Sequence, residues 1–231
     1  MKRVYQNVAV APAEGGFAIT LDDRPVRTPG RKTLVVPSAA LAEAIAAEWR
    51  AQGDRVEPHT MPLTRLASTA LDLVTERRPA IVEEIAAYAA TDLVCYRAEA
   101  PAELRARQET AWQPLLDWAA ERYGAALLVT AGVVPRPQPQ AALTALREAV
   151  EAHDDLALVA LHAATAAAGS LIVGLALLEG RIDAAAAFDV SQLDETFQIE
   201  KWGEDAEAVR RRRALRADLA EAAAFHRLRR D

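Results

Sequence analysis

The stretch SQLDETFQIEKWGED, residues 191–205, is the densest mixture of carboxylates, amides and aromatic rings in a region otherwise dominated by alanine. Asp183 upstream of it is typical of a helix N-cap and Gly203 of a helix end, so we expect one continuous helix between them. On a helical wheel this helix carries two apolar stripes, one with Phe197 and the other with Trp202. Two stripes indicate a helix enclosed in a bundle, or a helix whose second stripe is available to a partner.

The composition indicates a mostly helical protein. Of the 231 residues 52% are hydrophobic, but many are alanine, which has high helix propensity and buries little area. Aromatic residues make up only 5%, so each tryptophan is expected to anchor a core or an interface. The net charge of −6 argues against nonspecific nucleic-acid binding as the main role.

The single cysteine, Cys95, excludes an internal disulfide and a cysteine-based metal cluster. It lies in the apolar run DLVCY, which favours a buried, inert thiol over a nucleophile. The first residues, MKRVYQN, contain no apolar signal core, and the longest apolar run, residues 171–178, is too short to span a bilayer. We therefore expect a cytoplasmic protein without membrane insertion.

The N-terminal part predicts β structure. Glu14-Gly15-Gly16 is a turn signal between apolar segments. Ser38 predicts the N-cap of a helix that ends near Gly53. Short strands are expected at residues 4–10, 17–21, 26–28 and 34–36. We therefore expect a small β-rich domain with one helix over residues 1–58.

From residue 59 onward the apolar period is helical, which predicts a larger all-α domain, an orthogonal helical bundle, over residues 59–231. Pro79 is expected in the first turn of one helix, and Pro114 should kink or divide the helix over residues 101–123. Gly169 and Ser170 lie inside a pattern that predicts one helix from 155 to 178. Segments 91–96 and 126–133 fit helix or strand. The predicted fold class is thus α+β.

No catalytic residue is predicted, because the chain has no Walker A loop, no GxGxxG and no nucleophile elbow. The four histidines lack the i, i+4 spacing of a helical metal site, so we predict neither metal nor cofactor. Asp194 and Glu195 are adjacent, and on a helix they would diverge by roughly 100° instead of sharing one site.

Three polar residues in apolar surroundings are expected to be structural. A buried Arg65 needs a carboxylate, and the expected partner is Asp72 or an acid on another helix. Asp72 and Asp92 end apolar helical segments, so we expect caps or buried hydrogen-bond partners. One alternative is a carboxylate-dependent enzyme whose site, in a cleft between the two domains, would bring Arg65, Asp92 and Glu195 together. A purely structural helical scaffold is another alternative.

Six blocks of the sequence occur together in one known chaperone family. They are LDDRPVRTPGRKTLVVPSAALAEAIAAEW (21–49), MPLTRLASTALD (61–72), TDLVCYRA (91–98), RQETAWQPLLDWA (107–119), GSLIVGLAL (169–177) and DETFQIEKWG (194–203). By these blocks the chain resembles the ATP synthase F(1) complex assembly factor two family. The resemblance extends from Tyr5 to about Arg213, and six blocks in order at compatible spacing are highly specific.

The resemblance implies a two-domain chaperone without catalysis or a required cofactor. Such a chaperone holds the free F(1) alpha subunit and shields the surface that later meets the beta subunit, until the beta subunit replaces it. It is expected to be monomeric. Mitochondrial relatives carry an import presequence to the matrix, and this chain starts directly at the β domain, which indicates a bacterial member. The implied partner-binding residues are Asp194, Glu195, Phe197, Gln198, Trp202 and Gly203.

Overall fold

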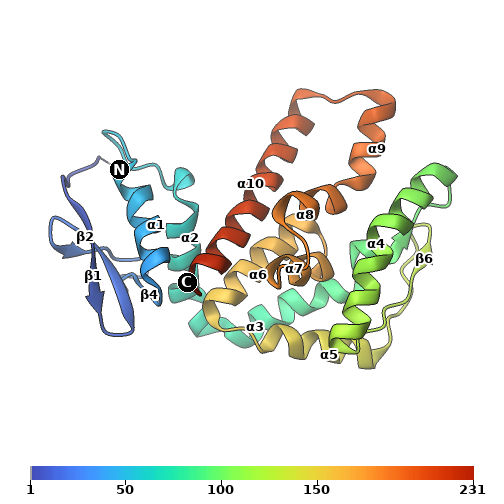
Figure 1. Cartoon of the computed structure of the whole chain (residues 1–231), viewed down its shortest axis with the longest axis horizontal. Helices are drawn as coiled ribbons and strands as arrows, with labels where there is room; N and C mark the ends of the chain where they lie inside the picture. Colours follow the sequence, from blue (N-terminus) through green and yellow to red (C-terminus); the bar gives the residue numbers. More distant parts are fainter. Residues whose placement is uncertain (1) are drawn as a thin grey trace. The chain divides into compact units, whose positions relative to one another are not determined.

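The computed structural model describes residues 2–231 and divides them into two compact units. The first unit contains residues 2–78, 155–160 and 224–231, and the second contains residues 79–154 and 161–223. Figure 1 shows the strands β1 (Val8–Ala13), β2 (Gly16–Leu21) and β4 (Val35–Val36) in the N-terminal part of the chain, with the helix α1 (Ala39–Arg50) beside them. The α+β class is confirmed. The expected domain boundary at residue 58 divides the chain differently from these units and stays a prediction.

The first unit is built on a four-stranded antiparallel sheet. β1 (Val8–Ala13) and β2 (Gly16–Leu21) form a hairpin in which Val8 pairs with Leu21 and Ala13 with Gly16. β3 (Arg24–Pro25) and β4 (Val35–Val36) both pair with β2. The hairpin and its turn were predicted, but β1 begins later than expected and β3 precedes the strand predicted at 26–28. Residues before Val8 make other contacts, such as the hydrogen bond from the Arg3 amide to the Asp54 carbonyl.

Gly16 must be glycine for this sheet to form. Its φ of +143° lies outside the range of ordinary side chains, and a Cβ there would lie 2.2 Å from the Val36 carbonyl oxygen. The helix α1 (Ala39–Arg50) follows the sheet and buries Leu41 and Ile45. The Ser38 side chain accepts a hydrogen bond from the Leu41 amide at 3.0 Å, which confirms the predicted N-cap.

After η1 (Pro58–Thr60), α2 (Pro62–Thr69) continues into the π-helical turn η2 (Ala70–Val74). Asp72 in this turn accepts hydrogen bonds from the Thr28 hydroxyl and the Gly30 amide, both at 2.7 Å. Asp72 therefore ties the loop between β3 and β4 to η2. It is a hydrogen-bond partner, as expected, but not the partner of Arg65.

The second unit is mostly helical, with α7 (Leu171–Leu178) at its centre, because all eight residues of α7 are buried. α7 packs against α4 (Ala102–Tyr123), α8 (Ala184–Ser191) and η3 (Ala87–Thr91). α4 ends at Gly124 in the left-handed region, and it continues through Pro114, so Pro114 does not divide the helix, and the alternative of a kink stays a prediction. The other helices with residues in this unit are α3 (Thr75–Ala86), η4 (Leu93–Cys95), α5 (Gln140–Glu151), α6 (Asp155–Ala168), α9 (Leu193–Trp202) and α10 (Ala206–Leu228).

Two predicted long helices are each two helices in the structure. Gly169, with a φ of +65°, ends α6, and Ser170 caps α7 by accepting from the Val173 amide at 3.0 Å. Gly169 and Ser170 are therefore a break and a cap, not helix interior. Asp183 caps α8 and Gly203 ends α9, as predicted, but Gln192 breaks the helix between them. Its φ of −108° and ψ of 20° are not helical.

The helical region also contains a small parallel sheet that was not predicted. β5 (Tyr96–Arg97) pairs with β6 (Thr130–Ala131). Of the two segments that fit helix or strand by sequence, 91–96 is mostly 3-10 helix and contains only the first residue of β5, whereas 126–133 contains β6. Pro79 lies inside α3 two residues after a non-helical residue, Arg77, so it stands near the start of the regular part of that helix.

Candidate functional site on α9

α9 buries one aromatic ring and exposes another. Phe197 is 3% exposed, whereas Trp202, the last residue of the helix, is 78% exposed. The expected second apolar stripe of Phe188, Ile199 and Trp202 is shortened, because the break at Gln192 places the buried Phe188 in α8. Trp202 therefore presents a large apolar surface at the end of α9.

Side chains of α4 hold one side of α9. The Gln108 amide nitrogen donates to Asp194 Oδ1 at 2.7 Å, and the Gln108 amide oxygen accepts from the Ala98 backbone at 2.7 Å. Gln108 is 2% exposed, so both bonds are shielded from water. Asp194 thus has one oxygen fixed by a buried amide.

Ion pairs extend this contact toward the end of α9. Arg107 of α4 pairs with Glu200 at 2.8 Å, and Lys201 pairs with Glu103 at 3.3 Å. The charged ends of Arg107 and Lys201 each lie 5.2 Å from the centre of the Phe197 ring. These pairs are largely exposed, so each adds little by itself, but together they fix the orientation of α9 against α4.

α10 holds α9 on another side. Arg211 pairs with Glu195 at 3.1 Å, and Arg212 donates to the Thr196 hydroxyl at 3.0 Å. Arg212 also pairs with Glu204 at 3.4 Å, and its guanidinium lies 5.1 Å from the centre of the Phe188 ring. Arg211 and Arg212, two members of the arginine run 210–213, therefore anchor α9 to α10.

The predicted partner-binding residues thus differ in what they can offer a partner. Asp194 and Glu195 already have partners within the chain, and Phe197 belongs to the core. Gln198 and Trp202 are exposed, and Gly203 ends the helix with a φ of +85°. α9 is a braced helix with an exposed tryptophan at its end.

A cleft of about 630 Å³ lies beside this helix, with Asp194, Gln108 and Val133 in its wall. Val133 is 90% exposed. The Arg97 guanidinium, also in the wall, donates to the carbonyls of Val94 and Tyr96 at 2.7 and 2.9 Å. The cleft is open and its arginine is engaged with the backbone, so it does not form a constellation for acid–base chemistry.

Asp92 is a structural carboxylate. It has no exposed surface, and it accepts from the Ser170 hydroxyl at 2.5 Å and the amides of Ile172 and Val94 at 3.1 and 3.2 Å. Burial raises the pKa of Asp92 to about 6, and these hydrogen bonds oppose that rise. A group without exposed surface cannot contact a substrate, which removes Asp92 from the enzyme alternative.

Cys95 is buried beside Asp92, and burial raises the pKa of its thiol to about 12, with the Asp92 charge adding to the rise. Its thiolate is therefore absent at neutral pH, as expected for an inert thiol. Arg65 differs from expectation: it is exposed, and within residues 2–231 it forms no ion pair. Solvent hydrates its charge, so no buried carboxylate is needed.

The residues that brace α9 were not predicted from the sequence. Gln108 and Arg107 lie in the block RQETAWQPLLDWA, which was used for the resemblance but not for a role. The adjacent charged residues Arg211 and Arg212 are typical of a solvent-exposed helix face. A single sequence does not show which helix packs against that face.

A family model described as ATP12 chaperone protein matches residues 2–120. This chain belongs to the ATP12 chaperone family. It is similar to the crystal structure of Atp12 from Paracoccus denitrificans, at 43% identity and a TM-score of 0.94, over 98% of this chain and 97% of that chain. A mutant of the same Paracoccus protein matches at 42% identity and a TM-score of 0.94, over 99% and 97%.

Two further relatives extend the ATP12 comparison. The Atu1473 protein from Agrobacterium tumefaciens is 43% identical, with a TM-score of 0.91, over 97% of this chain and 84% of that chain. The mitochondrial protein atp12 of Schizosaccharomyces pombe is 27% identical over 222 residues, which are 90% of this chain and 76% of the relative. The resemblance predicted from the six blocks is confirmed, and the chain is a chaperone, not an enzyme.

Proposed function

We propose that this ATP12-family assembly chaperone of ATP synthase holds the free F(1) alpha subunit and shields its beta-facing surface until the beta subunit replaces it. The observation that carries the proposal is the exposure of Trp202, 78%, at the end of a helix braced from two sides. Because the bracing contacts fix the backbone of α9, an aromatic anchor carried by this helix binds with a small loss of backbone entropy. The proposal includes action as a monomer in the bacterial cytoplasm without a cofactor.

A holding chaperone must bind tightly enough to prevent aggregation and must also release its client. An unassembled subunit exposes an apolar interface, and covering it suppresses aggregation. One exposed tryptophan with a polar rim of Gln198 and Glu195 supplies moderate affinity instead of an irreversible contact. Glu195 already pairs with Arg211, so a cation of the client would compete for a carboxylate that has a partner.

The experiment is binding of the alpha subunit by variants of the braced helix. Trp202→Ala should weaken binding by about 2 kcal/mol or more, which is roughly 30-fold in Kd, because an anchor is truncated. Trp202→Ala combined with Glu195→Lys should abolish it. Leu73→Ala is the matched control, since Leu73 is an exposed apolar residue, 49% exposed, in the first unit.

Circular dichroism should show unchanged helix content for each variant, because Trp202 is not part of the core. Normal alpha-subunit binding by the double variant would remove α9 as the client site. Equal losses for Leu73→Ala and Trp202→Ala would show that exposed apolar area in general, not this residue, drives binding.

A further inference from the structure

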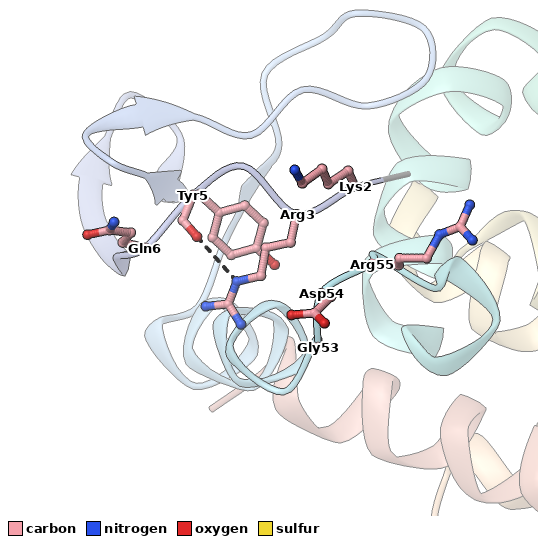
Figure 2. A pocket seen from close by; sticks show the side chains of 7 residues that line it. All are labelled: Lys2, Arg3, Tyr5, Gln6, Gly53, Asp54 and Arg55. Atoms are coloured by element: carbon pink, nitrogen blue, oxygen red, sulfur yellow. Dashed lines mark hydrogen bonds between the residues drawn. The ribbon is translucent and has the colours of Figure 1, made fainter.

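A pocket of about 940 Å³ in the first unit lies between the residues before β1 and the loop after α1, far in sequence from α9. Lys2, Arg3 and Arg55 contribute three positive charges to its lining, and Asp54 contributes one negative charge. This cationic pocket is unusual in a chain whose net charge is −6. Figure 2 shows its lining residues.

Arg3 is held in a fixed position in this cationic pocket. Its guanidinium donates to the Tyr5 carbonyl at 3.2 Å and to the Gln52 carbonyl, and it lies 4.6 Å from the centre of the Tyr5 ring. The Arg3 amide also donates to the Asp54 carbonyl at 2.9 Å. Arg3 therefore joins the two walls of the pocket, so its charge is part of the scaffold.

Lys2 and Arg55 are exposed, and neither forms an ion pair with any residue in the described part of the chain. Their backbones form an isolated antiparallel bridge, which keeps the two residues opposite each other. Two cations without internal partners, held at one pocket, produce a local positive potential that attracts anions.

The arrangement of these charges selects the kind of anion. In Figure 2 the side chains of Lys2, Arg3 and Arg55 extend in different directions instead of meeting at one point. A single phosphate is bound best by hydrogen-bond donors that converge on one point. Carboxylates spaced along an extended polypeptide can instead each pair with a different, separated cation. Val4, 83% exposed between Arg3 and Tyr5, adds an apolar contact that suits a polypeptide better than a small ion.

We propose that the cationic pocket at Lys2, Arg3 and Arg55 binds an extended acidic segment of another polypeptide. Charge complementarity would make its association rate fall steeply as salt rises. This inference goes beyond the proposed function, because it concerns a different surface and does not depend on α9 or on the alpha subunit.

The test measures binding of a labelled hexaglutamate peptide to the full chain by fluorescence anisotropy, at about 20 mM and about 200 mM salt. Lys2→Glu with Arg55→Glu should raise the peptide Kd roughly tenfold or more at low salt. Arg3 stays unchanged because it supports the backbone. The matched control is Arg24→Glu with Arg65→Glu, two exposed arginines in the first unit, for which the Kd should change less than about twofold.

Two further ligands complete the test. Hexaglutamine should not bind, and tripolyphosphate should compete only weakly. The proposal is overturned if hexaglutamate binds the wild type no better than the charge-reversed pocket variant. It is also overturned if the control variant loses as much affinity for hexaglutamate as the pocket variant. Tripolyphosphate binding as tight as hexaglutamate binding would also overturn it, because the site would then recognise a compact anion. None of these results bears on alpha-subunit binding by Trp202.

Discussion

At the scale of single residues, the buried carboxylate Asp92 joins two elements of the second unit. Asp92 caps η4 by accepting a hydrogen bond from the Val94 amide. It also accepts a hydrogen bond from the hydroxyl of Ser170, and Ser170 itself caps α7. A carboxylate in this position favours its protonated form more than in the unfolded chain, because burial penalises the charge. Its pKa in the folded chain, about 6, is therefore above the usual value of 3.8.

This shift predicts a pH dependence of stability. The folded chain binds a proton at Asp92 more tightly than the unfolded chain, so the stabilisation is complete below about pH 4 and is lost as pH rises through about 6. Relative to Asp92→Asn, which cannot titrate, the wild-type free energy of unfolding should fall by about 3 kcal/mol across that range. Urea unfolding of both proteins at a series of pH values measures this change in the free energy of unfolding. If the free energies of the two proteins changed in parallel with pH, the role of Asp92 would be refuted.

Residue-level predictions succeeded where the chemistry is local. Ser38 and Asp183 act as N-caps because each side chain accepts a hydrogen bond from the backbone amide three residues ahead, a pattern that the sequence alone indicates. Gly124 and Gly203 end helices because a positive φ favours glycine. The burial of Asp92 and the exposure of Arg65 depend on which elements pack around them, so their surroundings were harder to predict.

At the scale of elements, the helix breaks were the main error. Gln192 carries no sequence signal for a break, and its conformation follows from how α8 and α9 pack. Gly169 does carry a signal, but the apolar period continues past it, and that period favours helix interior. Of the candidate site, the position of α9, its end at Gly203 and the exposed Trp202 were within reach of the sequence, whereas its bracing by Gln108 was not.

The close packing of α6 and α7 gives a prediction at this scale. A Cβ at Gly174 would lie 2.5 Å from the Thr165 hydroxyl and 3.2 Å from the Thr165 amide, so neighbouring atoms must move. We expect Gly174→Ala to lower the free energy of unfolding by about 1–3 kcal/mol, because overpacking outweighs the better helix propensity of alanine.

Gly53→Ala is the matched control, because a Cβ at Gly53 meets no atom within 4 Å. Its effect on the free energy of unfolding should be within about 0.5 kcal/mol. Thermal unfolding of both variants measures the difference. If Gly174→Ala were as stable as Gly53→Ala, α6 and α7 would not approach as closely as the structure shows.

At the scale of the whole molecule, the order of the chain does not determine the compact units. Residues 155–160 and 224–231 belong to the same unit as residues 2–78, although many helices separate them along the chain. The composition changes near residue 58, and this change is visible in the sequence. The sequence does not show that a segment late in the chain packs with residues near its start. No helix in residues 2–231 has the length and apolar composition needed to cross a bilayer.

Family membership and the structure support one account of the molecule: an ATP12-family chaperone that presents a braced helix with an exposed tryptophan. The structure shows the contacts from α4 and α10 that brace α9. These contacts fix the helix that carries the anchor before a partner binds. The account also predicts release, because a contact with one main anchor can be displaced by a partner with a larger interface.

The most direct test is the solubility of the isolated alpha subunit, measured by centrifugation with the wild-type chaperone, with Trp202→Ala, and after addition of the beta subunit. The account predicts that the wild type keeps the alpha subunit in the supernatant, that Trp202→Ala does so much less, and that the beta subunit frees the chaperone. An alpha subunit that precipitates equally with and without the wild-type chaperone would contradict it.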